Sequence, residues 1–200
     1  MRVFLAGASG VIGLRLLPLL VAAGHQVAAM TRTPVKTAQL RALGAEPVVC
    51  DVFDLDALRH AVATFAPHVV VHQLTDLPED KTRLVELSAA NDRMRREGTR
   101  NLLTAAKAAG SRIVAQSIAW PLPADRQTAV DDHERGILDA AGVVIRYGQF
   151  YGPGTCYEHD LPSPPRIHID TASRRTVPLL DAPTGVIVIV DDQPKPAEAP

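Results

Sequence analysis

Apolar runs and amphipathic segments alternate along almost the whole chain. Short apolar runs bounded by turn residues predict buried strands at 3–6, 26–30, 47–50, 69–72, 112–115, 143–146 and 186–190. Apolar residues at helical spacing predict helices at 14–23, 35–43, 55–65, 82–109 (one long or broken helix), 128–141 and 171–180. Strands that alternate with helices in this way indicate an α/β fold. We expect a doubly wound, mostly parallel Rossmann-type sheet with helices on both faces.

Length and composition limit the number of domains. The chain has 200 residues, of which 46% are hydrophobic and only 4% aromatic, so alanine and valine supply most of the core. This length is enough for one domain with a real core. We expect that domain to span residues 1–192 and to be followed by a disordered, proline-rich tail at 193–200.

Charge and cysteine content exclude several classes of partner. A net charge of −1 with dispersed charges predicts no nucleic-acid partner. No apolar stretch is long enough to cross a bilayer, and Gly7 interrupts the first apolar run, so neither a membrane partner nor a signal peptide is expected. Cys50 and Cys156 form no disulfide framework, which suits the reducing cytoplasm. His68 and His72 would lie about 13 Å apart on a strand, so no metal site is expected.

The junction of the first strand and first helix carries three glycines at regular spacing. In Gly7-x-x-Gly10-x-x-Gly13 the glycines allow a tight turn, a close approach of the backbone to a ligand and close packing of the helix on the sheet. The helix N-terminus adds unpaired N–H donors, so the turn is suited to a dinucleotide pyrophosphate. Ser9, Val11 and Ile12 complete the turn and share this expectation. The alternative is a purely structural glycine turn.

The end of the second strand indicates which dinucleotide binds. An NAD site usually places a carboxylate about 20 residues after the glycines, but the first acid of this chain is Glu46. Thr31 and Arg32 occupy the position instead, and a cationic side chain there suits a ribose 2′-phosphate. We therefore predict NADP(H) in preference to NAD(H), with a solvated surface arginine as the alternative for Arg32.

The end of the third strand is expected to receive the adenine. Asp51, followed by Val52, is placed to accept a hydrogen bond from the adenine amino group. The other interpretation of Asp51 is a helix cap, but Asp54 is better placed to cap the helix that begins at Leu55. At the other end of the chain, Asp170 is expected to cap the helix that begins at Thr171.

Several stretches together resemble the extended or atypical short-chain dehydrogenase/reductases of the NAD-dependent epimerase/dehydratase type. The matching stretches are 7–13, 51–52, 97–103, 112–117, 146–153 and 166–170. The resemblance implies a nicotinamide site lined by residues that follow the fourth, fifth and sixth strands. These are Gln73, Leu74, Ser117, Tyr147, Gly148, Gln149 and Phe150.

The chain departs from this family at the acid-base residues. The family uses a Ser or Thr with a Tyr-x-x-x-Lys pair, in which the lysine lowers the tyrosine pKa. Ser117 is present, but the positions of the Tyr and Lys fall on Arg126 and Val130. Other candidate proton donors are His133, Tyr151 and a water held by Ser117. For His133, a solvated surface position on a charged helix is the expectation that we favour.

The substrate side of the chain is short. Only residues 154–165 separate the Tyr-Gly-Pro loop from the Arg-Ile-His-Ile strand, within substrate-side loops at 151–166, so a nucleotide sugar would lack its usual walls. The expected pocket is formed by loops 75–80, 120–127 and 150–165, with Trp120, Phe150 and Tyr157 as apolar surfaces. A small carbonyl or quinone-like substrate is expected, reduced by an oxidoreductase.

Other functions stay open at this point. A non-catalytic NADP(H)-binding protein that reports redox state, a sugar epimerase or dehydratase, and a scaffold that has kept only the fold are the alternatives. The expected partner is a small-molecule substrate or none, and a homodimer is an open alternative.

Overall fold

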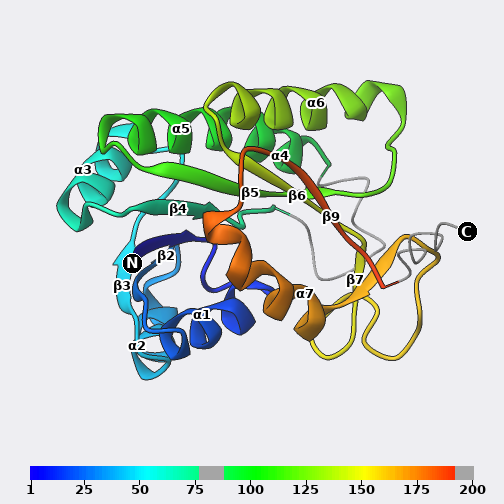
Figure 1. The fold of residues 1–200 in the computed structure, drawn as a ribbon, viewed down its shortest axis with the longest axis horizontal. Helices are drawn as coiled ribbons and strands as arrows, with labels where there is room; N and C mark the ends of the chain where they lie inside the picture. Colours follow the sequence, from blue (N-terminus) through cyan, green and yellow to red (C-terminus); the bar gives the residue numbers. More distant parts are fainter. Residues whose placement is uncertain (77–87, 192–200) are drawn as a thin grey trace, which may run out of the picture.

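Seven parallel strands form the central sheet in the part of the chain that the computed structural model describes, residues 1–76 and 88–191. Their order is β3-β2-β1-β4-β5-β6-β9 (Figure 1). The strands are β1 (Arg2–Ala6), β2 (Gln26–Thr31), β3 (Glu46–Val49), β4 (Val69–His72), β5 (Arg112–Ile118), β6 (Val143–Tyr147) and β9 (Gly185–Ile189). Each predicted strand is present. The strand order reverses beside β1, which pairs with both β2 and β4, and ligands of such sheets bind at this point.

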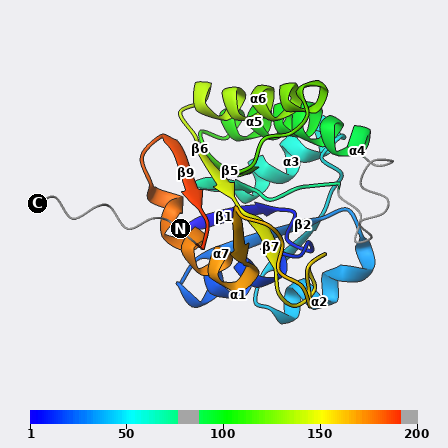
Figure 2. The same cartoon turned by 90° about the vertical axis from the view of Figure 1, so that its right-hand side faces the viewer.

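Helices cover both faces of the sheet. They are α1 (Gly13–Ala22), α2 (Thr37–Ala42), α3 (Leu55–Phe65), α4 (Ser88–Arg93), α5 (Thr99–Ala108), α6 (Ala124–Asp139) and α7 (Ile169–Thr176), with shorter turns η1 (Pro34–Lys36), η3 (Met94–Gly98) and η4 (Val177–Asp181). Figure 2 shows α1, α2 and α7 on one side and α3, α4, α5 and α6 on the other. The predicted doubly wound α/β fold is confirmed.

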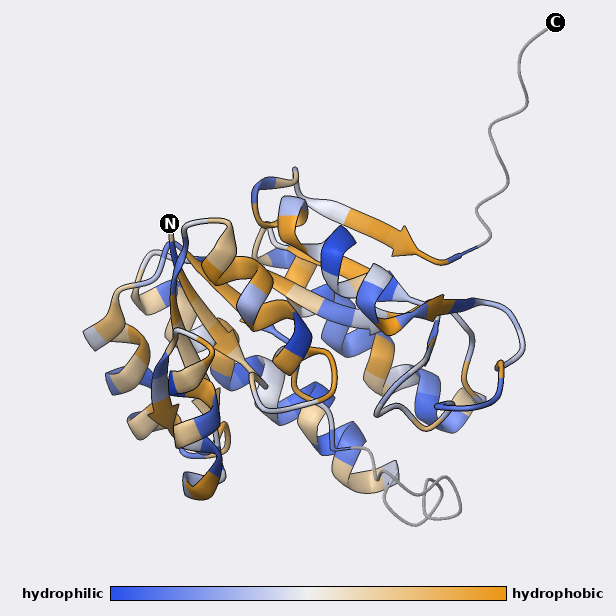
Figure 3. Cartoon of the chain, turned by 90° about the horizontal axis from the view of Figure 1, so that it is seen from below, coloured by the Kyte–Doolittle hydropathy of each residue, from blue (hydrophilic) through white to orange (hydrophobic). Residues whose placement is uncertain are grey.

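Two apolar cores lie between the sheet and these helix layers. Successive residues of β1 point to opposite faces. Val3 and Leu5 join the core that holds Leu16 of α1, whereas Phe4 belongs to the core that holds Leu58 of α3. Because both faces are covered, β1 is buried from Val3 to Ala6, which explains the continuous apolar run in the sequence. Figure 3 shows the hydrophobic colour along most strands and both colours on the helices.

Some helix boundaries differ from the prediction. The helix expected at 82–109 is divided: α4 continues through a π-helical turn, η3, into α5, and residues 82–87 lie outside the described residues. The α6 helix begins at Ala124, four residues before the predicted start, directly after Pro123. Proline has no backbone N–H that needs a hydrogen-bond partner, so it is tolerated at the position directly before the first turn of a helix.

The predicted cap of α7 is wrong. His168, not Asp170, is the N-cap residue, and its ring accepts a hydrogen bond from the Asp170 backbone N–H at 3.3 Å. Asp170 lies in the first turn instead, where a carboxylate interacts favourably with the helix dipole. Its side chain pairs with Arg15 of α1, a contact between residues 155 positions apart that local pattern does not reveal.

A small second sheet lies beyond the carboxyl ends of the main strands. The strands β7 (Gln149–Tyr151) and β8 (Arg166–His168) pair in parallel and flank the loop between them. Gly148 allows this arrangement, because a Cβ atom there would lie 2.6 Å from the Arg166 carbonyl carbon. Residues 193–200, expected to form a disordered tail, lie outside the described residues. Among the described helices, none combines the length and apolarity that a bilayer crossing requires.

Candidate NAD(P) site

The glycine turn joins the end of β1 to the start of α1. Gly7 has a positive φ of +89°, and a Cβ atom there would lie 2.7 Å from the Gln73 carbonyl oxygen. A Cβ atom at Gly13 would lie 2.1 Å from the Gly7 carbonyl oxygen. Gly10 differs, because it is exposed and its Cβ would meet only the Gly7 carbonyl oxygen, at 3.3 Å. Gly7 and Gly13 are therefore required by packing, whereas Gly10 leaves the outside of the turn open.

The N-terminus of α1 has the properties of an anion site. No side chain caps this helix, and no acid lies in its first turn. Unpaired backbone N–H groups and the positive end of the helix dipole therefore face the open side of the turn. A pyrophosphate group fits this donor set.

A network of side chains ties the turn to the end of β2. Ser9 and Thr31 are hydrogen bonded through their hydroxyl groups at 2.9 Å, and Thr31 Oγ1 also accepts a bond from Thr33 N. Lys36 Nζ donates to the Ser9 carbonyl oxygen at 3.3 Å. A cationic group therefore lies beside the turn, on the side of the predicted 2′-phosphate site. Lys36 follows Arg32 by four residues and is a second cation at this end of β2.

Arg32, the predicted selector of NADP(H), has an acidic partner. Its Nη2 donates a hydrogen bond to Asp76 Oδ1 at 2.8 Å, and this bond is the main reason for a raised Arg32 pKa. Asp76 follows β4, so the pair joins the ends of two strands that are not neighbours in the sheet. The Arg32 side chain is 59% exposed and accessible to a ligand.

Asp51 and Val52 lie at the end of β3, as expected. Asp51 Oδ1 accepts a hydrogen bond from Phe53 N at 3.0 Å. Asp54 is the N-cap of α3, and its carboxylate accepts from Ala57 N, which confirms the predicted cap. Val52 is buried, and its carbonyl oxygen accepts from the Asn101 side chain. The adenine contact of Asp51 stays a prediction.

The residues expected around the nicotinamide differ in accessibility. Gln73 is buried, and Tyr147 is the last residue of β6 rather than a loop residue. The Tyr147 hydroxyl group contacts Thr176 Oγ1 at 2.6 Å and accepts a bond from Gln73 Nε2 at 3.5 Å. Burial raises the Tyr147 pKa to about 12. The Tyr147 phenol is therefore a core group and not an accessible acid. Gly148, Gln149 and Phe150 form the turn into β7 and its first half.

Ser117 contacts a carboxylate. It lies inside β5, which extends three residues beyond its predicted end. Its hydroxyl group donates to Glu134 Oε1 at 2.5 Å, and Arg146 donates to the same carboxylate at 2.5 to 3.2 Å. Val130, at the position of the family lysine, is buried, and Arg126, at that of the tyrosine, lies on the first turn of the same helix, α6.

His133 does not lie on a solvated surface, so that expectation is wrong. Only 3% of the residue is exposed, because the ring points from α6 toward α5 and the sheet. A chain of hydrogen bonds runs through it. The Leu74 backbone N–H donates to His72 Nδ1 (3.2 Å), His72 Nε2 contacts Thr99 Oγ1 (3.1 Å), Thr99 Oγ1 contacts His133 Nδ1 (2.7 Å), and His133 Nε2 donates to the Gln116 carbonyl oxygen (2.8 Å).

This chain of bonds defines the protonation of both rings. Because the Leu74 N–H donates to Nδ1 of His72, the His72 proton is on Nε2, which donates to Thr99 Oγ1. The Thr99 hydroxyl group then donates to Nδ1 of His133. Burial lowers the pKa of His72 and lowers that of His133 to about 4. Both imidazoles are therefore neutral at pH 7, and each holds its N–H in a protein hydrogen bond. Neither is suited to donate a proton to a substrate.

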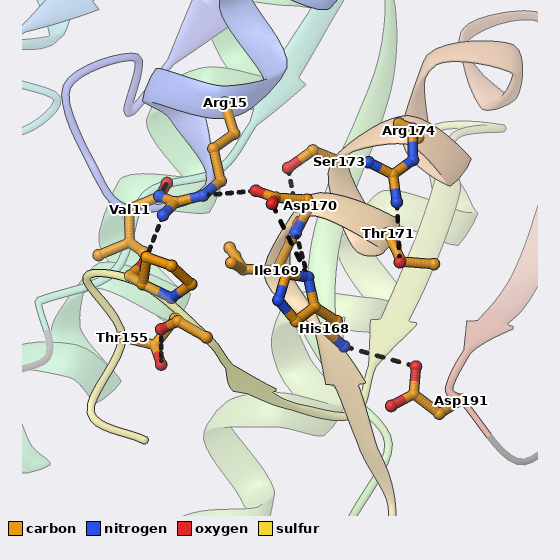
Figure 4. A network of polar contacts seen from close by, with 12 residues as sticks. Val11, Arg15, Thr155, His168, Ile169, Asp170, Thr171, Ser173, Arg174 and Asp191 are labelled. Atoms are coloured by element: carbon orange, nitrogen blue, oxygen red, sulfur yellow. Dashed lines mark hydrogen bonds and ion pairs between the residues drawn. The ribbon is translucent and has the colours of Figure 1, made fainter. Parts of the chain in front are cut away.

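Arg15 connects the glycine turn to the substrate-side loop. Figure 4 shows its guanidinium group between α1 and α7. Nη1 donates to the Val11 carbonyl oxygen at 2.9 Å, Nε donates to Asp170 Oδ1 at 2.9 Å, and Nη2 donates to the Pro153 carbonyl oxygen. Tyr151, a predicted catalytic candidate, packs edge-on against His168, with ring centroids 5.2 Å apart. Sequence reasoning missed Arg15, because its partners come from distant parts of the chain.

The predicted pocket is only partly within the described residues. Residues 77–80 lie outside them. A hollow of about 980 Å³ lies elsewhere, between α5 and α6, where Leu103 and Gly136 line it. Its lining residues include none of the residues predicted from the sequence to form the site, so this hollow is separate from the strand ends that carry them.

A family model for NAD(P)H-binding proteins matches residues 7–138. The match begins at the first glycine of the turn and covers the switch point of the sheet. The chain belongs to this NAD(P)H-binding family. The family assignment agrees with the geometry of the glycine turn, and NAD(P) binding is the property that it establishes.

Relatives of known sequence include a reductase. The chain is 37% identical to the 3-diazoavenalumate denitrifying reductase of a Streptomyces species over an alignment of 241 positions, gaps included, which covers 98% of this chain and 78% of the relative. An uncharacterized protein of Schizosaccharomyces pombe is 41% identical over 63 residues, 32% of this chain and 21% of that protein.

Solved structures confirm the resemblance to the epimerase/dehydratase-type fold. UDP-glucose 4-epimerase of Thermus thermophilus, in complex with NAD, superimposes with a TM-score of 0.77 at 18% identity, covering 95% of this chain and 78% of the epimerase. A putative epimerase of Burkholderia cenocepacia gives a TM-score of 0.76 at 20% identity, covering 96% and 76%. At these identities the likeness concerns the fold.

Proposed function

We propose that the protein is an NADP(H)-dependent reductase of a small organic acceptor that needs no strong protein acid. The observation that carries this proposal is the Ser117–Glu134–Arg146 cluster, in which the serine hydroxyl at the predicted nicotinamide site already donates its proton to a carboxylate. The reductase relative supports the reaction class. The first experiment is a measurement of NADPH oxidation in the presence of candidate acceptors.

NADP(H) is favoured over NAD(H) by charge. Arg32 and Lys36 lie beside Ser9 and Thr31, and the sequence has no acid before Glu46 to occupy the ribose site. A 2′-phosphate gains from cations and is repelled by a carboxylate. Titration of the purified protein with NADPH and with NADH tests this preference, and equal affinity for the two would contradict it.

The choice of acceptor follows from the available acids. Reduced nicotinamide supplies a hydride when it is bound. Hydride addition to a simple ketone gives a strongly basic alkoxide, which requires a positioned acid, whereas addition to a quinone gives a weakly basic phenolate that takes its proton from water. His133 is neutral and buried, and Tyr147 has a raised pKa, so a quinone-like acceptor suits this site better.

A diazo compound is the second candidate acceptor, favoured by the same lack of an acid and by the name of the reductase relative. Hydride addition to the terminal nitrogen of an aryldiazonium ion gives an aryldiazene. Loss of N₂ from that aryldiazene, with transfer of its N–H hydrogen to carbon, gives the arene. Neither step requires a proton from the protein.

The test panel contains 1,4-benzoquinone, benzaldehyde, acetophenone and benzenediazonium. We expect NADPH oxidation with the quinone or the diazonium ion and little with acetophenone. Oxidation by none of the four would contradict the reductase proposal. If NADPH still bound tightly, a non-catalytic NADP(H)-binding regulator would become the better interpretation.

A further inference from the structure

Two arginines lie together between the π-helical turn η3 and the first turn of α6. Arg95 belongs to η3, which packs against α6, and Arg126 is the third residue of α6. The Arg95 side chain is only 15% exposed. Arg95 Nη1 and Arg126 Nε are buried and have no hydrogen-bond partner. A buried charged donor without a partner is costly, so the arrangement is incomplete as it stands.

The nearby carboxylates do not complete it. Asp92 Oδ1 forms an ion pair with Arg95 Nη1 at 3.6 Å, longer than a hydrogen bond, and is itself buried without a hydrogen-bond partner. The Glu134 carboxylate is held by Arg146 and Ser117. Burial lowers the Arg95 pKa, and the positive charge of Arg126 lowers it further against the opposing effects of Asp92 and Glu134. The two guanidinium groups therefore lie close enough to repel each other, and each keeps a buried donor without a hydrogen-bond partner.

A third donor lies on the same helical face. Asn91 is four residues before Arg95 along the continuous α4–η3 helix, so the two side chains are neighbours. Asn91 is buried, its Oδ1 accepts from Asp76 N at 3.1 Å, and its Nδ2 has no partner. Asn91 Nδ2 is thus a third buried donor without a partner, on the same helix as Arg95.

Arg126 connects this region to the candidate active site, and Arg95 also lines the hollow between α5 and α6. Arg126, Val130 and Glu134 follow one another at four-residue steps along one stripe of α6, and Glu134 accepts the Ser117 hydroxyl. Arg126 therefore lies on the α6 stripe that meets β5 at Ser117. A π-helical turn such as η3 is also frequent at functional sites.

We propose that Arg95 and Arg126 bind the carboxylate of a small organic-acid substrate, with the Asn91 amide as an additional donor. The inference rests on the proposed reductase function and names its substrate class. The planar guanidinium group matches the two carboxylate oxygens, and the buried donors Arg95 Nη1 and Arg126 Nε have no hydrogen-bond partner of their own.

The test is a calorimetric titration of benzoate and of benzamide, its neutral isostere, into the protein saturated with NADP⁺. We expect benzoate to bind about tenfold more tightly than benzamide, the ratio expected for one charge-assisted hydrogen bond. Arg126→Gln and Arg95→Gln should remove this difference without changing NADP⁺ affinity. Arg126→Lys, which keeps the charge but not the planar fork, should retain part of it.

Arg135→Gln is the matched control. Arg135 also lies on α6, but its side chain is 68% exposed and pairs with Asp132, so benzoate binding should be unchanged. Circular dichroism monitors folding of every variant. If the glutamine variants do not fold, the benzoate and benzamide affinities of the unmodified protein decide.

Three results would overturn the inference: no detectable benzoate binding, equal affinity for benzoate and benzamide, or full benzoate affinity in both folded glutamine variants. Displacement of benzoate by equimolar sulfate would overturn the carboxylate assignment in favour of a general anion site. Because these are binding measurements, they separate the two proposals. Benzoate selectivity without any NADPH oxidation would contradict the reductase proposal alone, and quinone reduction without benzoate selectivity would contradict this inference alone.

Discussion

Arg32 at the end of β2 donates a hydrogen bond to Asp76, which follows β4, at 2.8 Å. The cation predicted to recognise a 2′-phosphate is therefore held in place by an acid that a phosphate must displace or share. We expect Arg32→Ala to weaken NADPH binding about tenfold and NADH binding much less, because only NADPH carries the phosphate. Fluorescence titration with each nucleotide measures both. An equal loss for NADPH and NADH would contradict the assignment of Arg32.

The opposite change is expected for Asp76→Asn. Removing this carboxylate frees Arg32 and removes a repulsion from the phosphate, so NADPH binding should become about threefold tighter. NADH binding is the internal control and should change little. A weaker NADPH affinity would show that Asp76 mainly orients Arg32.

The Ser117–Glu134–Arg146 cluster is expected to contribute to stability. Glu134 is only 6% exposed, and Glu134→Gln would remove the negative charge opposite Arg146 and replace one of the two acceptor oxygens by an NH₂ donor. Because Arg146 is 43% exposed and water replaces part of the loss, we expect about 1–3 kcal/mol of destabilisation in urea unfolding. Ser117→Ala should cost about 1 kcal/mol. A Glu134→Gln protein as stable as the parent would contradict this view.

Local pattern predicted the strands well and the polar contacts poorly. Val69–His72 forms a buried apolar run whose structure depends mainly on its own composition, and its bounds are as predicted. The Asp170 assignment failed because His168 already satisfies the helix end and Arg15 attracts the carboxylate across the fold. The prediction for His133 failed for a similar reason. The charged residues of the helix predicted a solvated ring, but Thr99 supplies a buried hydrogen-bond partner for it.

The same limit applies to the candidate site. The glycine turn and its helix are consecutive in sequence, so spacing predicts them. Asp76 and Arg32 are 44 residues apart, and Ser117 and Glu134 are 17 apart on different elements. Such pairings depend on strand order, which the sequence pattern does not specify. The unsatisfied donors of Arg95 and Arg126 become visible only when burial is known.

The buried histidines should make stability depend on pH. Burial lowers the His133 pKa from 6.5 to about 4 in the folded protein, and the His72 pKa is also lowered. The unfolded chain therefore binds more protons between pH 6.5 and about 4, so the stabilisation is complete above pH 6.5 and is lost as the pH falls through this range. For His133 the loss is of the order of 3 kcal/mol.

Urea unfolding at several pH values between 7.5 and 4.5 measures this dependence. His133→Gln should reduce the slope relative to the parent protein, because one of the titrating groups is gone. Thr99→Val should lower stability by about 1–2 kcal/mol at every pH through loss of its hydrogen bonds, with the slope retained. Identical slopes for the parent and His133→Gln would show that other groups dominate.

Substitution of Tyr151 should affect quinone reduction and aldehyde reduction differently. If quinone reduction takes its proton from water, Tyr151→Phe should change kcat for 1,4-benzoquinone less than about threefold. Any residual benzaldehyde reduction, which needs an acid, should fall about 100-fold if Tyr151 supplies it. The edge-on contact with the His168 ring is available to phenylalanine, so folding should be preserved. An equal, large loss for both acceptors would make Tyr151 a general requirement and contradict the water-dependent route.

The glycine turn offers a direct separation of folding from cofactor binding. A Cβ atom at Gly13 would lie 2.1 Å from the Gly7 carbonyl oxygen, so Gly13→Ala should destabilise the protein by more than about 2 kcal/mol. At Gly10 the added Cβ meets only the Gly7 carbonyl oxygen, at 3.3 Å, and the change should cost less than about 1 kcal/mol. That methyl group would nevertheless occupy the open side of the turn, where we expect the pyrophosphate to lie. Gly10→Ala should therefore fold normally and bind NADPH at least about tenfold more weakly. Normal NADPH affinity in this variant would place the pyrophosphate elsewhere, because no ligand could rest against the turn at Gly10 without meeting the new methyl group.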